Sequence, residues 1–397
     1  MIFSLLLLGV GLAPVNRPAA AANDAPQLAH PGEILFLRRD RRAYLAQLPE
    51  PLRRALCDSG IARWPSHKAV TTLRGTRGYG VDNRTQGFAW TIMLAAADAF
   101  GTGDERAAAA AVRLLDRWAK GRAMTKFKGR EIESMMYARN RTLLPTIVAY
   151  WLLLSDGKTV RFETRARIFG WIDALVRDSL AYQRSLDPRS PRARSNHALL
   201  AASVFTAWGA LLGEEDMFAE GVRAYRRAIR EMREDGSLPL ETRRGARALW
   251  YQRHAISSLA VIAEIAAVQG IDLWAYRSEG RDLHRAIAFL LDAIADPRRV
   301  WPYAAENRTP GPYRNYLVQD LGFMRTRPHG RHYMAWAEIY WSRFPDHPQA
   351  GRLTAALRSF EDEFRPMIDE YAGGNTTCFF HRPTSAEAAG ISGSSTR

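Results

Sequence analysis

Apolar residues recur at intervals of three and four over most of the chain, which is the period of an α-helix that buries one face. Gly213, Gly236 and Gly270 follow such segments at positions typical of helix C-terminal caps, and prolines fall between segments rather than within them. We find no convincing alternation of the kind that predicts β-strands. The clearest helical segments are 104–120, 142–154, 162–180, 196–212, 217–233, 246–268 and 282–295.

This order of helices and short separators predicts an all-α protein of about ten antiparallel helices. No repeat of fixed period supports an open solenoid of the tetratricopeptide type. We therefore expect the helices to close into an α/α toroid, also described as an incomplete α/α barrel. A single toroid domain is expected over residues 23–383, in a monomeric protein.

The two ends of the chain differ from this helical part. Residues 1–22 hold an apolar run followed by small residues, which is typical of a signal peptide, and residues 384–397 are rich in Ser, Gly and Ala, which predicts a disordered tail. No later segment is apolar enough to span a bilayer, so we expect a periplasmic or secreted protein without an integral membrane segment. Export would permit Cys57 and Cys378 to pair, but the sequence leaves that open.

The charge balance points to a polyanionic partner. There are 56 Lys and Arg residues against 41 Asp and Glu, which gives a net charge of +15. Nucleic acid is disfavoured because the arginines are scattered among helices and no zinc-finger spacing or RNA-binding signature is present. Two basic loops could instead clamp an anionic ligand. One spans 71–86 and includes Arg77, Tyr79 and Arg84, and the other contains Lys126, Lys128 and Arg130.

Two passages carry candidate chemistry. Arg244, Arg247, Tyr251 and His254 are spaced by three, four and three residues, so a helix that covers them would present one polar stripe. Asn196 and His197 begin a long apolar helix, and Ser195 could cap it. The alternative for each passage is structural: a solvated helix face in the first and plain capping in the second.

These residue types suit β-elimination from a uronic acid. The proton on C5 is weakly acidic because it lies next to a carboxylate, and that carboxylate must be neutralised before a base can remove the proton. An amide such as Asn196 and a cation such as Arg244 can neutralise it. A His and a Tyr can act as base and acid, or one Tyr can fill both roles. This scheme needs neither a metal nor a redox cofactor.

The order of these motifs resembles the bacterial periplasmic alginate lyases of polysaccharide lyase family 5 and their superfamily. The resemblance covers about residues 190–275 and rests on Asn196-His197, 235–241, Arg244, 247–249, Tyr251 and 269–273. It implies an α/α toroid that degrades a polyuronide such as alginate or glucuronan. The sequence departs from the family at 198–200 and at Gln252, so the resemblance supports the chemistry more strongly than alginate as the substrate.

The resemblance also implies roles for individual residues. Asn196 and Arg244 would neutralise the carboxylate, His197 would be the base, and Tyr251 would be the acid or both acid and base. Arg247 and His254 would line the substrate subsites. The family's lysine-containing lid motif is not evident, and Arg77, Tyr79 or Arg84 would replace it.

Two other functions remain open from the sequence. A glycoside hydrolase on a helical toroid would need two facing carboxylates, and Asp235, Glu241 and Glu338 are available without a spacing that compels a pair. A non-catalytic module that binds an acidic exopolysaccharide would explain the basic charge but not the combination of Asn196, His197, Arg244 and Tyr251. Metal binding is weakly indicated, because His329 and His332 lack nearby carboxylate ligands.

Overall fold

The computed structural model describes residues 27–75, 82–155, 160–308 and 314–383. These residues form fifteen α-helices, four short strands and several 3₁₀ turns. The helices are α1 (Arg38–Gln47), α2 (Glu50–Cys57), α3 (Gln86–Thr102), α4 (Glu105–Lys120), α5 (Ile132–Leu154), α6 (Phe162–Ser185), α7 (Asn196–Leu212), α8 (Glu215–Glu231), α9 (Pro239–Thr242), α10 (Ala248–Val268), α11 (Leu283–Ala295), α12 (Trp301–Ala304), α13 (Trp336–Arg343), α14 (Pro348–Arg358) and α15 (Thr376–Phe380).

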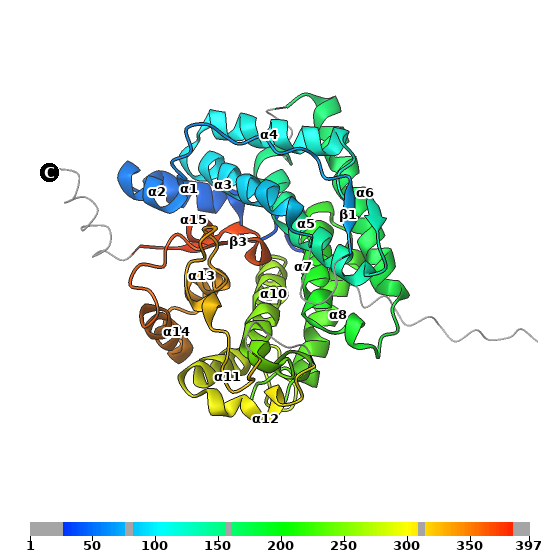
Figure 1. Cartoon of the computed structure of the whole chain (residues 1–397). Coiled ribbons are helices and arrows are strands. Elements are labelled where there is room, and N and C mark those ends of the chain that lie inside the picture. The colour runs from blue at the N-terminus through cyan, green and yellow to red at the C-terminus, as the bar shows by residue number, and fades with distance from the viewer. Residues whose placement is uncertain (1–26, 76–81, 156–159, 309–313, 384–397) are drawn as a thin grey trace, which may run out of the picture.

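The long helices fall into an inner and an outer set. Helices α3, α5, α7 and α10 are apolar on almost every side and are buried along most of their length. Helices α4, α6, α8 and α11 bury one face each; in α8 that face includes Phe218, Val222, Tyr225 and Ile229, at helical spacing. The expected all-α toroid is thus confirmed, with outer helices covering an inner ring (Figure 1).

Each inner helix packs against the outer helix that follows it, in the pairs α3–α4, α5–α6, α7–α8 and α10–α11. Each outer helix brings the chain back to the end of the toroid where the preceding inner helix began. The inner helices therefore run in the same direction, and their N-terminal ends lie at the same end of the toroid. Tyr137 in the second turn of α5 stacks on His197 of α7, and its ring also meets that of His254 of α10. This arrangement brings three helix N-termini together.

The C-terminal segment returns to the beginning of the chain. Helix α15 packs against α2, α3 and α13 (Figure 1). A disulfide joins Cys57 of α2 to Cys378 of α15 across 321 residues. Gly101 of α3 lies against this disulfide, where a Cβ atom would come within 2.2 Å of the Cys57 sulfur. The pairing that the sequence left open is therefore formed, and it links the two ends of the helical array.

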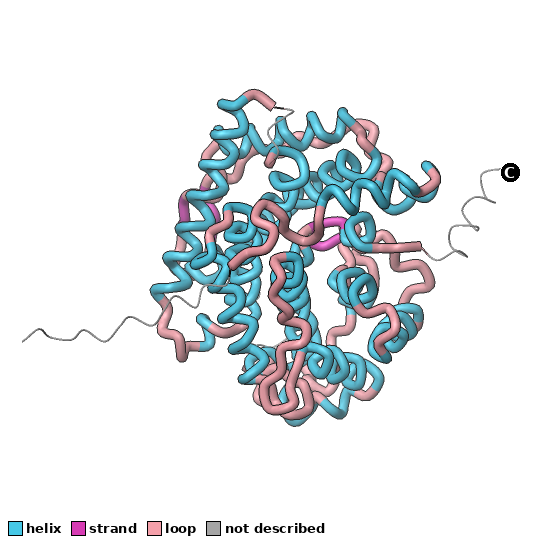
Figure 2. The backbone as a smooth tube through the Cα atoms, turned by 180° about the vertical axis from the view of Figure 1, so that it is seen from behind, coloured by secondary structure: helices cyan, strands magenta, loops and turns pink. Residues whose placement is uncertain are grey.

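Two small sheets were not expected from the sequence (Figure 2). Strand β1 (Thr72–Arg74) pairs in parallel with β2 (Lys126–Lys128), and β3 (Ile368–Asp369) pairs antiparallel with β4 (Gly374–Asn375). Strands of two or three residues are too short to produce a detectable alternation of apolar and polar positions. Within the described ranges, no helix has the length and apolar character needed to cross a membrane.

Candidate active site

Asn196 begins α7 and is completely buried. Its backbone N–H donates to Glu241 Oε1 at 2.7 Å, and its side-chain Nδ2 donates to Glu241 Oε2 at 2.5 Å. Glu241 therefore accepts from the first backbone N–H of α7, and Ser195, which the sequence offered as a possible cap, makes no side-chain capping bond. The Oδ1 atom of Asn196 has no hydrogen-bond partner among the described residues.

Arg244 lies between Glu241 and Tyr251. Its Nε donates to the Leu240 carbonyl at 3.0 Å and lies 3.5 Å from Glu241 Oε2, and its guanidinium carbon is 4.4 Å from the centre of the Tyr251 ring. Asn196, Glu241, Arg244 and Tyr251 thus form a continuous chain of contacts. A cation held over an aromatic ring in this way restricts the conformations of both side chains.

One helix would have to cover Arg244, Arg247, Tyr251 and His254 for a single polar stripe to form, and α10 does not cover them all. Gly245 has a φ of 56°, in the left-handed region that interrupts an α-helix, and α10 begins only at Ala248. Arg244 and Arg247 therefore precede the helix, while Tyr251 and His254 lie on its first turns. Arg244 still reaches Tyr251, but through the turn rather than along a helical stripe.

His254 is buried beneath the site, with 2% of its surface exposed. Burial, together with the charges of Arg253 and His197, lowers its pKa well below the usual value, so the imidazole is neutral at neutral pH. Its ring meets the Tyr371 ring at 4.2 Å, and its Nε2 has no hydrogen-bond partner in the described part of the chain. A neutral, buried imidazole nitrogen of this kind is suited to contact a ligand.

His197 is held from two sides by residues of α5. Its Nδ1 lies 3.2 Å from Glu133 Oε1, and its ring stacks on Tyr137 with centroids 4.2 Å apart. The hydrogen bond with His197 lowers the pKa of Glu133 against the opposing effect of burial, and Arg192, at 3.2 Å, lowers it further. With Nδ1 facing this carboxylate at 3.2 Å, the other ring nitrogen, Nε2, is left to accept a proton.

Sequence reasoning missed the contribution of α5. Glu133, Tyr137 and Arg141 are four residues apart and share one helix face, the same kind of signal that marked Tyr251 and His254. The Tyr137 hydroxyl is 2.5 Å from that of Tyr371, and burial raises the pKa of both phenols. Tyr371 follows β3 in a short segment without periodicity, so no local signal could have found it.

The remaining residues predicted to bind substrate are placed differently. The Nε of Arg247 is 3.4 Å from Asp320 Oδ2, and its guanidinium lies over the Trp250 ring at 5.3 Å. Arg84 pairs with Asp82 and donates to the Thr72 carbonyl at 2.7 Å, beside β1. Both are thus held by carboxylates outside the group around Tyr251. Arg77 and Tyr79 lie outside the described residues.

The site favours an anionic ligand. The N-termini of α7 and α10 carry partial positive charge, and Arg244 and the buried Arg141 add full charges. Glu241 and Glu133, each engaged by neighbouring donors, and the buried Glu370, 3.8 Å from Arg141 Nε, partly offset these charges. Within the described ranges no three His, Cys, Asp or Glu side chains meet as metal ligands would, and the groups on offer are an amide, imidazoles, guanidiniums and phenols.

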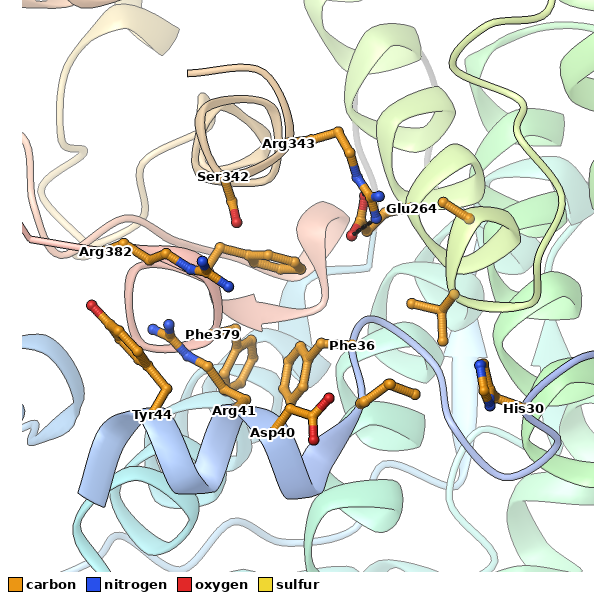
Figure 3. A pocket seen from close by; sticks show the side chains of 14 residues that line it. His30, Phe36, Asp40, Arg41, Tyr44, Glu264, Ser342, Arg343, Phe379 and Arg382 are labelled. Atoms are coloured by element: carbon orange, nitrogen blue, oxygen red, sulfur yellow. Dashed lines mark hydrogen bonds and ion pairs between the residues drawn. The ribbon is translucent and has the colours of Figure 1, made fainter. Parts of the chain in front are cut away.

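A separate pocket lies at the C-terminal end of α10 (Figure 3). It has a volume of about 480 Å³, and its wall includes Glu264, thirteen residues beyond Tyr251 and so roughly 20 Å along the helix. Glu264 pairs with Arg343 at 2.7 Å, and Arg41 donates to the Cys378 carbonyl at 3.0 Å. The charges of Glu264 and Arg343 compensate each other, and Arg41 is engaged by a backbone carbonyl. This pocket is therefore not the candidate active site.

Comparison with known proteins finds relatives that are named as polysaccharide lyases. A polysaccharide lyase from Stenotrophomonas maltophilia (strain K279a) is 30% identical over 195 residues, 49% of this chain and 56% of the relative. An alginate lyase from Pseudomonas syringae pv. syringae (strain B728a) is 28% identical over 243 residues, 60% of this chain and 58% of the relative. The chain thus spans just over half the length of these relatives.

The fold is shared with a solved structure. The crystal structure of alginate lyase A1-III from Sphingomonas species A1 superposes with a TM-score of 0.70 at 22% identity and covers 90% of this chain and 98% of that one. At this identity the likeness establishes a common α/α toroid. The family model for alginate lyase matches residues 74–300, more than half of the sequence, and the chain therefore belongs to the alginate lyase family of polysaccharide lyases.

Proposed function

We propose that this protein cleaves a uronic-acid-containing polysaccharide, such as alginate, glucuronan or a related polymer, by β-elimination. The observation that carries the proposal is the convergence of Asn196, Arg244 and Tyr251 through Glu241, beside the His197–Glu133 pair. This group combines a carboxylate-binding amide and guanidinium with two groups that can move protons. Family membership over residues 74–300 and the names of the relatives support the same reaction class.

The first requirement of the reaction is neutralisation of the substrate carboxylate. Glu241 occupies the backbone N–H of Asn196 and one of its two side-chain N–H groups, which leaves the other for the substrate. Arg244, whose Nε is taken by the Leu240 carbonyl, can present its terminal N–H groups to the same carboxylate. Together these donors stabilise the negative charge that develops when the C5 proton leaves.

The second requirement is transfer of two protons. His197, with Nδ1 held by Glu133, presents Nε2 as the base that takes the C5 proton. The electron pair of that bond forms the C4–C5 double bond, the C4–O bond breaks, and Tyr251 protonates the departing oxygen. When the proton and the leaving group lie on the same face of the sugar, Tyr251 can serve as both base and acid, and His197 then stabilises the carboxylate.

Hydrolysis is less well supported, because each of the three carboxylates that the sequence offered for it, Asp235, Glu241 and Glu338, has a structural role. Glu241 holds the start of α7, and Asp235 accepts from the Ser237 N–H at 2.8 Å and the Tyr303 hydroxyl at 2.7 Å. Burial would raise the pKa of Glu338, but bonds with His381 and Arg365 lower it to about 2. A general acid needs a raised pKa, which Glu338 lacks.

We also infer that the protein works outside the cytoplasm. The disulfide between Cys57 and Cys378 and the N-terminal run of residues 1–22 support an exported, disulfide-permissive location. Cell fractionation of the native protein, followed by thiol labelling without and with reductant, tests this inference. Recovery in the periplasm or medium with both thiols blocked is expected, and a cytoplasmic protein with free thiols would contradict it.

The test of the reaction is ultraviolet absorbance during incubation with poly-mannuronate, poly-guluronate, glucuronan and hyaluronan. Elimination creates a double bond conjugated with the carboxylate, so absorbance should rise with at least one polymer and name the substrate. Release of reducing ends without any rise would indicate hydrolysis. Binding without either product would indicate the non-catalytic module.

A further inference from the structure

The outer face of the β1–β2 sheet is cationic. The parallel register places Thr72 beside Lys126, Leu73 beside Phe127 and Arg74 beside Lys128. Since side chains alternate along a strand, Leu73 and Phe127 share the inner face, while Arg74, Lys126 and Lys128 share the outer one. Leu73 is buried, and the Arg139 guanidinium lies over Phe127 at 4.2 Å, so the inner face is fixed against the helices. The cations are therefore directed to solvent.

A groove of about 530 Å³ runs along this face. Its lining includes the cations Lys68, Arg74, Arg84 and Lys128 and no carboxylate. Arg84 pairs with Asp82, whereas no carboxylate of the described residues forms an ion pair with Lys68, Arg74 or Lys128. Residues 76–81, outside the described ranges, contain no acidic residue either.

The register of these cations is unfavourable without an anion. Like charges directly opposite each other on neighbouring strands destabilise a sheet, and Arg74 and Lys128 are paired in this way. A ligand with several negative charges would offset that repulsion and would gain from all of the cations at once. A single small anion could satisfy only part of the groove.

The groove adjoins the candidate active site without being part of it. Lys128 lies five residues before Glu133, so even an extended chain separates them by at most roughly 17 Å. On the other side, Asn83, next to Arg84, accepts from Arg141 Nη2 at 3.2 Å. A polymer whose reacting sugar lies near His197 could therefore reach the groove with its neighbouring sugars.

We propose that this groove, formed by Lys68, Arg74, Lys128 and the adjoining Lys126, binds the anionic polysaccharide several sugars away from the bond that is cleaved. The inference rests on the proposed function and deepens it, because it predicts a preference for long polymers over short oligosaccharides. Nucleic acid fits the groove less well, since among the described residues no aromatic ring lines it on which a base could stack.

The test compares two triple variants with the same change in net charge. The first is Lys68→Gln, Arg74→Gln and Lys128→Gln, all exposed positions; the backbone N–H of Arg74, which bonds to Asp82, is retained. The matched control is Arg39→Gln, Arg285→Gln and Arg358→Gln, exposed arginines of α1, α11 and α14. Circular dichroism establishes that both are folded before any measurement.

Two readouts are taken. The first is the Kd for the long uronate polymer that the parent chain cleaves, measured at several salt concentrations in a Tyr251→Phe background. The second is kcat/KM for that polymer and for a tetrasaccharide prepared from it. The groove variant should bind the polymer roughly tenfold more weakly and with a shallower salt dependence, because it lacks three cationic side chains that would contact carboxylates of the polymer. Its kcat/KM for the tetrasaccharide should change by no more than about twofold.

The outcomes separate the two proposals. A groove variant that matches the control on polymers of every length would overturn the groove while leaving the lyase intact. A loss of affinity for single-stranded DNA without a loss for the uronate polymer would identify a nucleic-acid site and would also overturn it. If the folded parent chain neither binds nor cleaves any uronate polymer, the proposed function itself fails, and the groove inference fails with it.

Discussion

The two ends of α10 both carry buried polar groups, but they satisfy them differently. At the C-terminal end, Glu264 accepts from Arg343 (Figure 3). It also accepts from Trp274, so its charge is compensated within the protein. At the N-terminal end, Asn196 Oδ1 and His254 Nε2 are buried without a partner among the described residues. An unpartnered buried polar atom costs about 1–3 kcal/mol, and a ligand that forms hydrogen bonds with Asn196 Oδ1 and His254 Nε2 would remove that cost. We infer that the first end is structural and that the second end binds the ligand.

The largest difference between the two ends is expected for Tyr251→Phe, which removes one hydroxyl at the N-terminal end of α10. The rate of elimination should fall by about 10³-fold, because the departing oxygen loses its proton donor. The ring and its contact with Arg244 remain, so the Kd for the polymer should stay nearly unchanged. Initial rates and calorimetric binding measure the two effects, and a variant with near-normal turnover would remove Tyr251 from the acid role.

Arg244→Ala should have the next largest effect. Loss of the guanidinium exposes the substrate carboxylate to an uncompensated Glu241, and kcat/KM should fall by about 10²-fold. Arg244→Lys is the matched control, because it keeps the charge but not the planar stack over Tyr251, and it should recover part of the loss. Equal kcat/KM values for wild type and Arg244→Ala would contradict the neutralising role.

Glu133→Gln should act through His197. A charge-assisted hydrogen bond of about 1.5 kcal/mol corresponds to roughly a tenfold loss of rate. The pKa of Glu133 is lowered, so its carboxylate persists through mildly acidic pH, and its support of His197 is lost only as pH falls through that lowered value. The Gln variant lacks this titration. Superimposable pH–rate profiles, after scaling, would show that Glu133 does not position the base.

The smallest effect on activity is expected at the opposite end of α10. Glu264→Gln leaves the candidate site untouched, so kcat/KM should remain within about twofold of wild type, as for a site distant from the chemistry. The variant loses the charge that pairs with Arg343, and the free energy of unfolding should fall by about 1–3 kcal/mol in urea titrations. A tenfold fall in kcat/KM without a fall in the free energy of unfolding would contradict the structural role of the C-terminal end of α10.

The toroid could be predicted from the sequence because helical periodicity is local and repeated. Buried helices such as α7 are apolar nearly throughout, and outer helices such as α8 keep the spacing of Phe218, Val222 and Ile229. The beginning of α5 was missed because polar residues interrupt its apolar pattern where Glu133 and Arg141 face the site. The polar residues that interrupt the helical pattern of α5 are therefore the same residues that face the candidate site.

The candidate site could be predicted in part for the same reason. Asn196, His197, Tyr251 and His254 stand out as polar groups at the starts of apolar helices. The helix break at Gly245 depends on backbone conformation, and the position of Tyr371 beside Tyr137 depends on tertiary packing. Short-range sequence patterns encode neither. Cys57 and Cys378 could be noted but not paired, since 321 residues separate them.

The most direct test of the central claim is the mass of the product. Elimination adds no water across the cleaved bond, so one of the two fragments ends in an unsaturated uronate that is lighter by one water than a hydrolysis product. Mass spectrometry of oligosaccharides released from a uronate polymer by the purified protein should show this lighter species and none in the Tyr251→Phe reaction. Fragments that all carry the added water would contradict β-elimination and favour hydrolysis.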